Sequence, residues 1–301
     1  MPVIEDLYPS RISHRPELAE RVDPVVYPDG PGKRLSAEDA ASYEANGYLF
    51  AGRLFQPDEI AQLNQELRRL AASEEIRNLE ECIIEPGSDS VRSIFRVHEL
   101  SPIFDWLSRD TRLLDTARQI LGGDVYLHQS RVNLKPGFSG KDFYWHSDFE
   151  SWHIEDGMPR MRALSVSLSL TENYSFNGPL MLMPGSHKVY VACVGRTPEN
   201  HYQQSLKRQE YGVPDKESLK RLADRGGIVA PTGPAGSAVF FDCNTMHGSN
   251  SNITPYPRSN VFFVYNSVEN TLQEPFCGLR PRPQHIAARK SFAPLMPLER
   301  G

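Results

Sequence analysis

A chain of 301 residues, with 39% hydrophobic and 24% charged residues, has the composition of an ordinary globular protein and is long enough for one large domain or two average ones. Its formal net charge is −5 and no polybasic block occurs, so we expect no nucleic-acid partner and no anionic-lipid partner. The first residues contain no continuous apolar run, so we expect no signal peptide, no membrane span and a cytoplasmic location. The four cysteines form no Cys-x-x-Cys pair and are expected to be reduced thiols.

The first third of the chain is predicted to be an arm followed by helices. Residues 1–34 contain recurrent prolines and no sustained period, which indicates an irregular arm wrapped over the body or over a partner. Residues 35–123 are predicted to form a helical flank. Its first helix is capped by Ser36 and stopped at Gly47, its second is capped by Asp58, and its third covers residues 101–121.

One weak strand is expected within this flank, at residues 83–98, and another short strand or turn at residues 48–55. Helices are otherwise expected to fill this part of the chain.

Beyond Gly123 the pattern changes to short alternating segments bounded by Gly, Pro or Asn, which is typical of strands. This pattern predicts a mainly β fold with flanking helices, whose core is a double-stranded β-helix, also called a jelly roll or cupin fold. The segments are residues 124–135, 162–170, 180–183, 237–241 and 260–266.

No linker divides the chain, so residues 1–301 are predicted to form a single domain with its jelly-roll core at residues 124–275. A polar insertion with a helix at residues 216–224 is expected within residues 190–225, and residues 276–301 are expected to form a tail rich in Pro and Arg.

Three residues have the types and spacing of a metal site. His146 and Asp148 stand two apart, so on an extended strand their side chains leave the same face. His247 follows an apolar strand that a jelly roll can bring beside them. Two imidazoles and one carboxylate form the facial triad of non-haem Fe(II) oxygenases, although Zn²⁺ accepts the same ligands.

Arg258 is the residue that discriminates between these metal chemistries. It opens an alternating strand, and an inward guanidinium there would bind a dicarboxylate through two parallel hydrogen bonds. The alternative is an outward arginine that only solubilises the strand. On the strand of residues 127–135, Gln129, Arg131, Asn133 and Lys135 share one polar face, which is consistent with a cavity wall or with an exposed strand.

These residues, with the segment of residues 178–187, resemble the Fe(II)- and 2-oxoglutarate-dependent dioxygenases of the phytanoyl-CoA hydroxylase type. The block of residues 143–162 is similar to the signature of the ectoine hydroxylases within that family. The resemblance implies hydroxylation of ectoine to 5-hydroxyectoine, with O2 consumed and succinate and CO2 released. It also implies a homodimer.

The same resemblance implies a role for each candidate residue. Iron would be held by His146, Asp148 and His247, and 2-oxoglutarate by Arg258 and Lys135 with Asn133, Phe143 and Ser249 nearby; Gln129 and Trp152 would hold ectoine. A flat amidinium cation suits the face of Trp152, a contact that contributes about 0.5–2 kcal/mol.

Three other functions are consistent with the residues themselves. They are a dioxygenase of the same fold acting on another small amino-acid derivative, a jelly-roll protein that binds a metal or ligand without turnover, and a zinc hydrolase. An inward Arg258 would argue against simple binding, because such a protein needs no buried anchor for a dicarboxylate.

Overall fold

The computed structural model describes residues 5–28, 30–31, 34–85, 89–205 and 211–298. A seven-stranded antiparallel sheet dominates it, with the strand order β2-β10-β7-β12-β5-β4-β3. Its strands are β2 (Tyr48–Ala51), β3 (Cys82–Ile84), β4 (Val91–Phe95), β5 (Val125–Lys135), β7 (Ala163–Ser169), β10 (Ala238–Asp242) and β12 (Arg258–Ser267).

A smaller sheet of three strands faces the large one. Its order is β6-β11-β8, from β6 (Phe143–His146), β11 (His247–Ser249) and β8 (Leu180–Leu182). Side chains of β8, β10 and β12 meet between the sheets in one apolar cluster, of which Leu182, Phe241 and Phe262 are members. Two antiparallel sheets closed over a common interior form the predicted double-stranded β-helix, and the fold class is confirmed.

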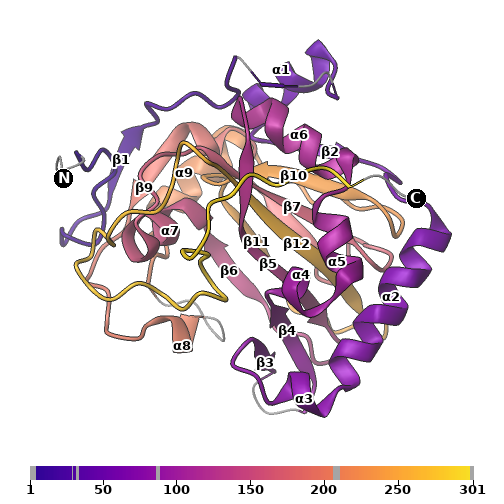
Figure 1. Cartoon of the computed structure of the whole chain (residues 1–301). Coiled ribbons are helices and arrows are strands. Elements are labelled where there is room, and N and C mark those ends of the chain that lie inside the picture. The colour runs from indigo at the N-terminus through magenta and orange to yellow at the C-terminus, as the bar shows by residue number, and fades with distance from the viewer. Residues whose placement is uncertain (1–4, 29, 32–33, 86–88, 206–210, 299–301) are drawn as a thin grey trace.

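Helices cover the other face of the large sheet (Figure 1). They are α1 (Ala37–Asn46), α2 (Pro57–Ala72), α3 (Glu74–Arg77), α4 (Val97–Leu100), α5 (Pro102–Ser108) and α6 (Thr111–Leu121). The main core lies between these helices and the sheet, and α6 packs on β5, β7 and β12. Three helices lie elsewhere, α7 (Asp148–Asp156), α8 (Tyr202–Ser205) and α9 (Lys216–Gly226), together with a 3-10 turn, η1 (Ser186–Lys188).

Strand β12 shows how alternation in the sequence divides the side chains between the two layers. Val261, Phe263 and Tyr265 belong to the main core under the helices. Residues of the opposite parity face the small sheet, where Phe262 joins the inner cluster. Arg258 lies on this same inner face and is 5% exposed. The outward alternative for Arg258 is therefore wrong.

The flank of residues 35–123 contains strands beside its helices, as expected, with β2 in the range 48–55 and β4 in the range 83–98. Strands β2, β3 and β4 come from it and provide both edges of the large sheet. The β4 strand pairs with β5 at the pocket end of the sheet, with Ser93 opposite Asn133. Such pairings join segments distant in sequence, so the local pattern gave little indication of them.

Two helix boundaries also differ from the prediction. The helix of residues 101–121 is two helices, because Asp110 caps α6 by accepting a hydrogen bond from the backbone N–H of Arg112 at 2.9 Å. In α2 the cap residue is Gln56 rather than Asp58, and the Glu59 carboxylate accepts the Gln56 backbone N–H at 2.8 Å. Helix α1 is confirmed with Ser36 and Gly47 at its ends.

The arm, the insertion and the tail all pack on the body. Within the arm, β1 (Glu17–Glu20) pairs with β9 (Val189–Ala192), so the arm is not wholly irregular. In the insertion, α9 confirms the predicted helix. The tail crosses the molecule (yellow in Figure 1) and buries Ile286. Residues 1–4, 29, 32–33, 206–210 and 299–301 of these segments, and residues 86–88 of the strand expected at 83–98, lie outside the described residues.

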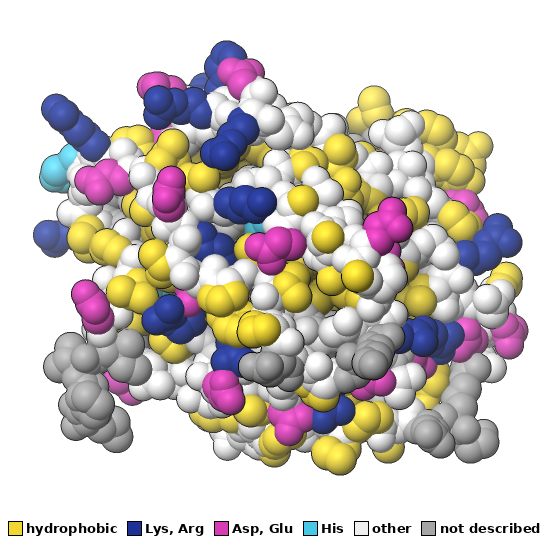
Figure 2. Space-filling model, turned by 90° about the horizontal axis from the view of Figure 1, so that it is seen from above, with side chains coloured by type: hydrophobic (Ala, Val, Ile, Leu, Met, Phe, Trp, Pro, Cys, Tyr) yellow, Lys and Arg dark blue, Asp and Glu magenta, His cyan; other side chains and the backbone are white. Residues whose placement is uncertain are grey.

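Charge is spread evenly over the face in Figure 2, where Lys and Arg side chains alternate with Asp and Glu and form no patch of one sign. Among the described residues, no helix combines the length and the apolar character that a membrane span requires.

Candidate active site

The three proposed metal ligands lie together between the sheets. His146 ends β6 and His247 begins β11; the two residues are paired in register, with ring centroids 4.2 Å apart. Asp148 was predicted to lie on the same strand as His146, but it is the first residue of α7. The sequence of α7 hid this helix because both its polar and its apolar residues are buried, which leaves no amphipathic stripe. The turn from strand to helix still directs Asp148 toward the histidines.

The geometry of the triad fits a divalent metal ion. The Nδ1 atom of His146 lies 2.8 Å from the Tyr144 carbonyl oxygen, and that of His247 lies 3.0 Å from the Thr245 carbonyl oxygen. A carbonyl only accepts, so each Nδ1 carries the proton and each Nε2 keeps a free lone pair. The two Nε2 atoms lie 3.7 and 3.8 Å from the Asp148 carboxylate, too far for hydrogen bonds and close enough for one ion to bridge.

The protonation states also suit a metal. Burial, together with the neighbouring His247, lowers the pKa of His146 to about 3, so its imidazole is neutral at pH 7. Burial opposes ionisation of Asp148, but the two imidazoles and Arg131 outweigh it and lower the pKa of this carboxyl. Ser165 supports the carboxylate, since its hydroxyl donates to Asp148 at 3.2 Å. All three ligands lie within 4.8 Å of one another.

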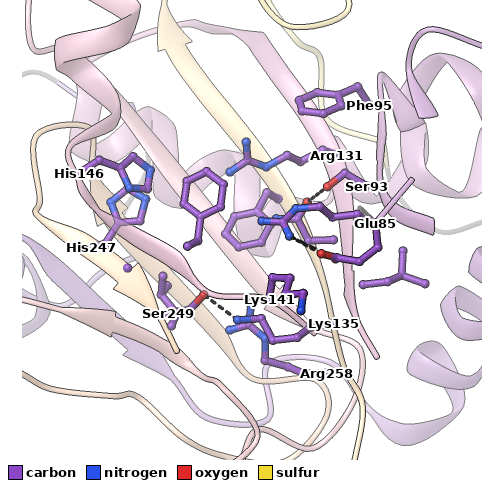
Figure 3. A pocket seen from close by; sticks show the side chains of 17 residues that line it. Glu85, Ser93, Phe95, Arg131, Lys135, Lys141, His146, His247, Ser249 and Arg258 are labelled. Carbon is purple, nitrogen blue, oxygen red and sulfur yellow. Dashed lines mark hydrogen bonds and ion pairs between the residues drawn. The ribbon is translucent and has the colours of Figure 1, made fainter. Parts of the chain in front are cut away.

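A pocket beside the triad ends in two buried basic side chains, Lys135 and Arg258, which face each other across β5 and β12 (Figure 3). Arg258 has no hydrogen-bond partner for its Nε and Nη1 atoms among the described residues. Burial lowers its pKa to about 10. A buried guanidinium with two unpaired nitrogens is costly unless an anion binds it, and a carboxylate matches its geometry.

Lys135 is the second basic side chain at this end. Its Nζ donates to the Ser249 hydroxyl at 2.8 Å and to the Asn250 carbonyl, but no carboxylate pairs with it. Burial, with Arg258 and Arg92 nearby, lowers the pKa of Lys135 to about 6. Burial and the neighbouring guanidinium groups therefore keep the Lys135 amine largely neutral at pH 7, and an anion bound between Lys135 and Arg258 would favour its protonation.

Three further predicted residues line the same pocket. The Phe143 ring lies 4.8 Å from the His146 ring, and Asn133 accepts a hydrogen bond from the Ser93 hydroxyl at 2.8 Å. Ser249 lies between the triad and the two basic side chains, two residues after His247. The five predicted cosubstrate residues, on β5, β6, β11 and β12, thus line one cavity with the two histidines of the triad.

The two residues predicted to hold the substrate do not line this pocket. Gln129 donates to the Ile286 carbonyl of the tail at 2.7 Å and accepts from Arg131 at 3.1 Å. Trp152 is 3% exposed and packs against His128, with ring centroids 5.2 Å apart. Both are buried beside the tail, and their contact with a substrate remains a prediction.

The sequence analysis did not include several lining residues. Arg131 carried the same signal as Asn133 and Lys135, since it shares their strand face, and in Figure 3 its guanidinium points toward His146 on the side of the pocket away from Lys135 and Arg258. Phe262 likewise shares the strand face of Arg258. Other lining residues depend on strand pairing or loop position, which sequence alone does not give; among them are Glu85, Arg92, Ser93, Phe95 and Lys141.

Among the described residues, the remaining histidines and the cysteines form no group whose spacing would hold a metal ion. His153, for example, is buried and lies 2.8 Å from the Met158 carbonyl and 2.9 Å from Asp6, as expected for a satisfied histidine. The four cysteines are free thiols, as predicted, and three are buried.

The model of the family described as Phytanoyl-CoA dioxygenase (PhyH) matches residues 43–260, which include all three triad residues and Arg258. The chain belongs to this family. An ectoine dioxygenase of Bordetella parapertussis is 59% identical over 98% of this chain and 96% of the relative. One of Sphingopyxis alaskensis is 52% identical over 99% of this chain and 97% of the relative.

Solved structures agree with this assignment. The crystal structure of EctD from S. alaskensis with 2-oxoglutarate and 5-hydroxyectoine has a TM-score of 0.89 and 49% identity, and covers 99% of both chains. The structure of the same protein with bound Fe has a TM-score of 0.88 and 48% identity over the same share. The epimerase SnoN, at 21% identity, shares the fold alone, with a TM-score of 0.59 and coverage of 77% of this chain and 82% of its own.

Proposed function

We propose that the chain is an ectoine dioxygenase. It hydroxylates ectoine to 5-hydroxyectoine, consumes O2 and 2-oxoglutarate, and releases succinate and CO2. The observation that carries this function is a His-Asp-His triad whose two histidines line one pocket with Arg258, a buried guanidinium with two unpaired nitrogens among the described residues. Relatives that are 50–59% identical over almost the whole chain are ectoine dioxygenases, which supports the substrate.

His146, Asp148 and His247 would hold Fe(II), and when bound the iron supplies O2 activation and oxidation of a carbon–hydrogen bond. The chain itself sets the ligand states: carbonyls of Tyr144 and Thr245 keep each imidazole proton on Nδ1. A facial triad leaves three positions on one side of an ion, so a chelating keto acid and O2 can share it.

Arg258 and Lys135 would bind the far carboxylate of 2-oxoglutarate. Burial lowers the pKa of each, so a carboxylate between them would compensate the buried Arg258 cation and favour protonation of Lys135. Asn133 and Ser249 provide polar groups along the same wall, and Phe143 provides an apolar one. This arrangement orients the keto acid with its other end toward the triad.

Gln129 and Trp152 would bind ectoine beside the triad. Trp152 is on α7, four residues after Asp148, and Gln129 is on β5, six residues before Lys135. In the present structure the Gln129 amide donates to the tail carbonyl of Ile286, so substrate contact requires this hydrogen bond to be exchanged or shared. An aromatic face and an amide suit a flat amidinium that carries a carboxylate.

We further infer a homodimer and a cytoplasmic location. The relatives' high identity supports a common assembly, and the even mixture of charges on the face in Figure 2 suits a protein free in aqueous solution.

The test is a reconstitution without oxygen. Purified protein loaded with Fe(II) should release succinate and 5-hydroxyectoine only when 2-oxoglutarate, O2 and ectoine are all present. Omitting each component in turn is the control. Succinate release at the same rate with and without ectoine would refute ectoine as the substrate. Activity with Zn²⁺ in the absence of O2 would indicate a hydrolase instead.

A further inference from the structure

Arg11 of the N-terminal arm is a buried cation held in an uncommon backbone conformation. It is 4% exposed and has a φ of 58°, in the left-handed region that residues other than glycine seldom adopt. Its backbone N–H donates to the Cys193 carbonyl at 2.8 Å, and the Cys193 N–H donates to the Ser10 hydroxyl at 2.8 Å. Strain of this kind persists only where surrounding contacts impose it.

The guanidinium of Arg11 binds two carboxylates of α7. Its Nε and Nη2 donate to the two oxygens of Glu150 at 2.9 and 2.6 Å, and its Nη1 donates to Glu155 at 2.6 Å. The Ser10 hydroxyl also donates to Glu150 at 2.6 Å. Both acids are buried, with Glu150 only 1% exposed, so Arg11 compensates charges that water does not reach.

The arm also packs on the apolar side of the same helix. Tyr8 is 1% exposed, and its ring lies 5.2 Å from that of Phe149. Tyr8 and Trp152 belong to one buried cluster. The arm therefore holds α7 by ion pairs and by packing together.

Helix α7 carries residues of the site at its start and in its middle. Asp148 is its first residue, and Trp152 follows one turn later. Asp148 lies just after the end of β6 at His146. Its side chain accepts one hydrogen bond from the described residues, donated by the Ser165 hydroxyl at 3.2 Å. The position of Asp148 therefore depends on how the whole helix is held.

We propose that Arg11 is a positioning residue for the active site, which fixes α7 so that Asp148 and Trp152 lie where iron and substrate need them. Arg11 touches neither group itself. The proposal rests on the proposed function for the identity of the metal and the substrate. It makes the N-terminal arm, through its contact with Glu150, part of the scaffold that positions the active site.

The matched variants are Arg11→Lys, which keeps the charge but loses the two-pronged contact with Glu150, and Arg112→Lys as control. Arg112 makes a comparable contact with Glu59 on the helical side of the large sheet, away from the triad. Three quantities are measured for each: the melting temperature, the Fe(II) dissociation constant without O2, and the ratio of succinate to 5-hydroxyectoine formed.

Arg11→Lys is expected to weaken Fe(II) binding at least tenfold and to raise the succinate-to-product ratio, while Arg112→Lys changes only the melting temperature. If Arg11→Lys has the same Fe(II) affinity and the same succinate-to-product ratio as the wild type, the proposal is overturned. If Arg11→Lys does not fold, the double variant Arg11→Gln with Glu150→Gln replaces it with the same two outcomes. This variant removes both charges of the Arg11–Glu150 pair and leaves Glu155 its contact with His201 at 3.1 Å.

Fe(II) affinity separates this proposal from the proposed function. If the wild type binds Fe(II) but does not hydroxylate ectoine, the substrate is wrong, and the effect of Arg11→Lys on Fe(II) binding still decides the role of Arg11.

Discussion

Replacing Arg258 with methionine should weaken 2-oxoglutarate binding and, without 2-oxoglutarate, stabilise the protein. Arg258 is buried and its Nε and Nη1 atoms have no partner among the described residues, so both are available to a carboxylate. A hydrogen bond to a charged group contributes about 1.5–3 kcal/mol. Two such bonds are lost in the variant, while Lys135 remains.

The lower end of that range, about 3 kcal/mol for the pair of bonds, corresponds to a Kd about 100-fold higher. The stability effect has the opposite sign. Burial lowers the pKa of Arg258 from 12.5 to about 10, and below that pH the buried cation destabilises the fold. Removing it should raise the free energy of unfolding of the ligand-free protein by up to about 3 kcal/mol.

Isothermal calorimetry without O2, with Fe(II) bound, measures the Kd for 2-oxoglutarate, and thermal unfolding without 2-oxoglutarate measures stability. Arg112→Met is the control, because its guanidinium is already paired with Glu59 and Asp110. An unchanged Kd in Arg258→Met, or a ligand-free variant less stable than the wild type, would show that Arg258 is not an uncompensated anchor.

Three further outcomes follow from the site. His146→Ala should lower Fe(II) affinity by more than about 100-fold and abolish turnover, whereas the exposed His14→Ala should do neither, as equilibrium binding and product assays would show. The ligand-free pKa of about 6 for Lys135 means that 2-oxoglutarate binding takes up a proton above that pH, so both the Kd for 2-oxoglutarate and the stability of the ligand-free protein should rise from pH 7 to 8.5. Lys135→Met should abolish the pH dependence of the Kd, and a Kd that does not change with pH in the wild type would contradict this prediction. Gln129→Ala should raise the KM for ectoine and leave the KM for 2-oxoglutarate unchanged, and equal changes in both would remove its substrate role.

The Lys135 prediction follows from the sign of its pKa shift. Between pH 6 and 10.5 the folded, ligand-free chain binds fewer protons at Lys135 than the unfolded chain, so the free energy of unfolding increases with pH over that interval. A bound dianion restores the proton, which removes this difference in the complex.

The sequence by itself determined the residue types and the strand faces. The alternation in β12 put Arg258 and Phe262 on one face, and that in β5 put Asn133 and Lys135 on another, because the side-chain period of a strand depends only on local geometry. The resemblance of residues 143–162 to ectoine hydroxylases depended on residue identity alone, and the comparisons confirmed the family.

Only the tertiary structure decided which of these faces meet and what surrounds them. The helix at Asp148 was hidden because α7 is buried on every side, so its sequence has no polar stripe. The contact of Arg11 with Glu150 joins residues 139 positions apart, and the pairing of β4 with β5 adds Arg92 to the pocket wall. Burial and long-range pairing arise from packing the whole chain, so local periodicity does not encode them.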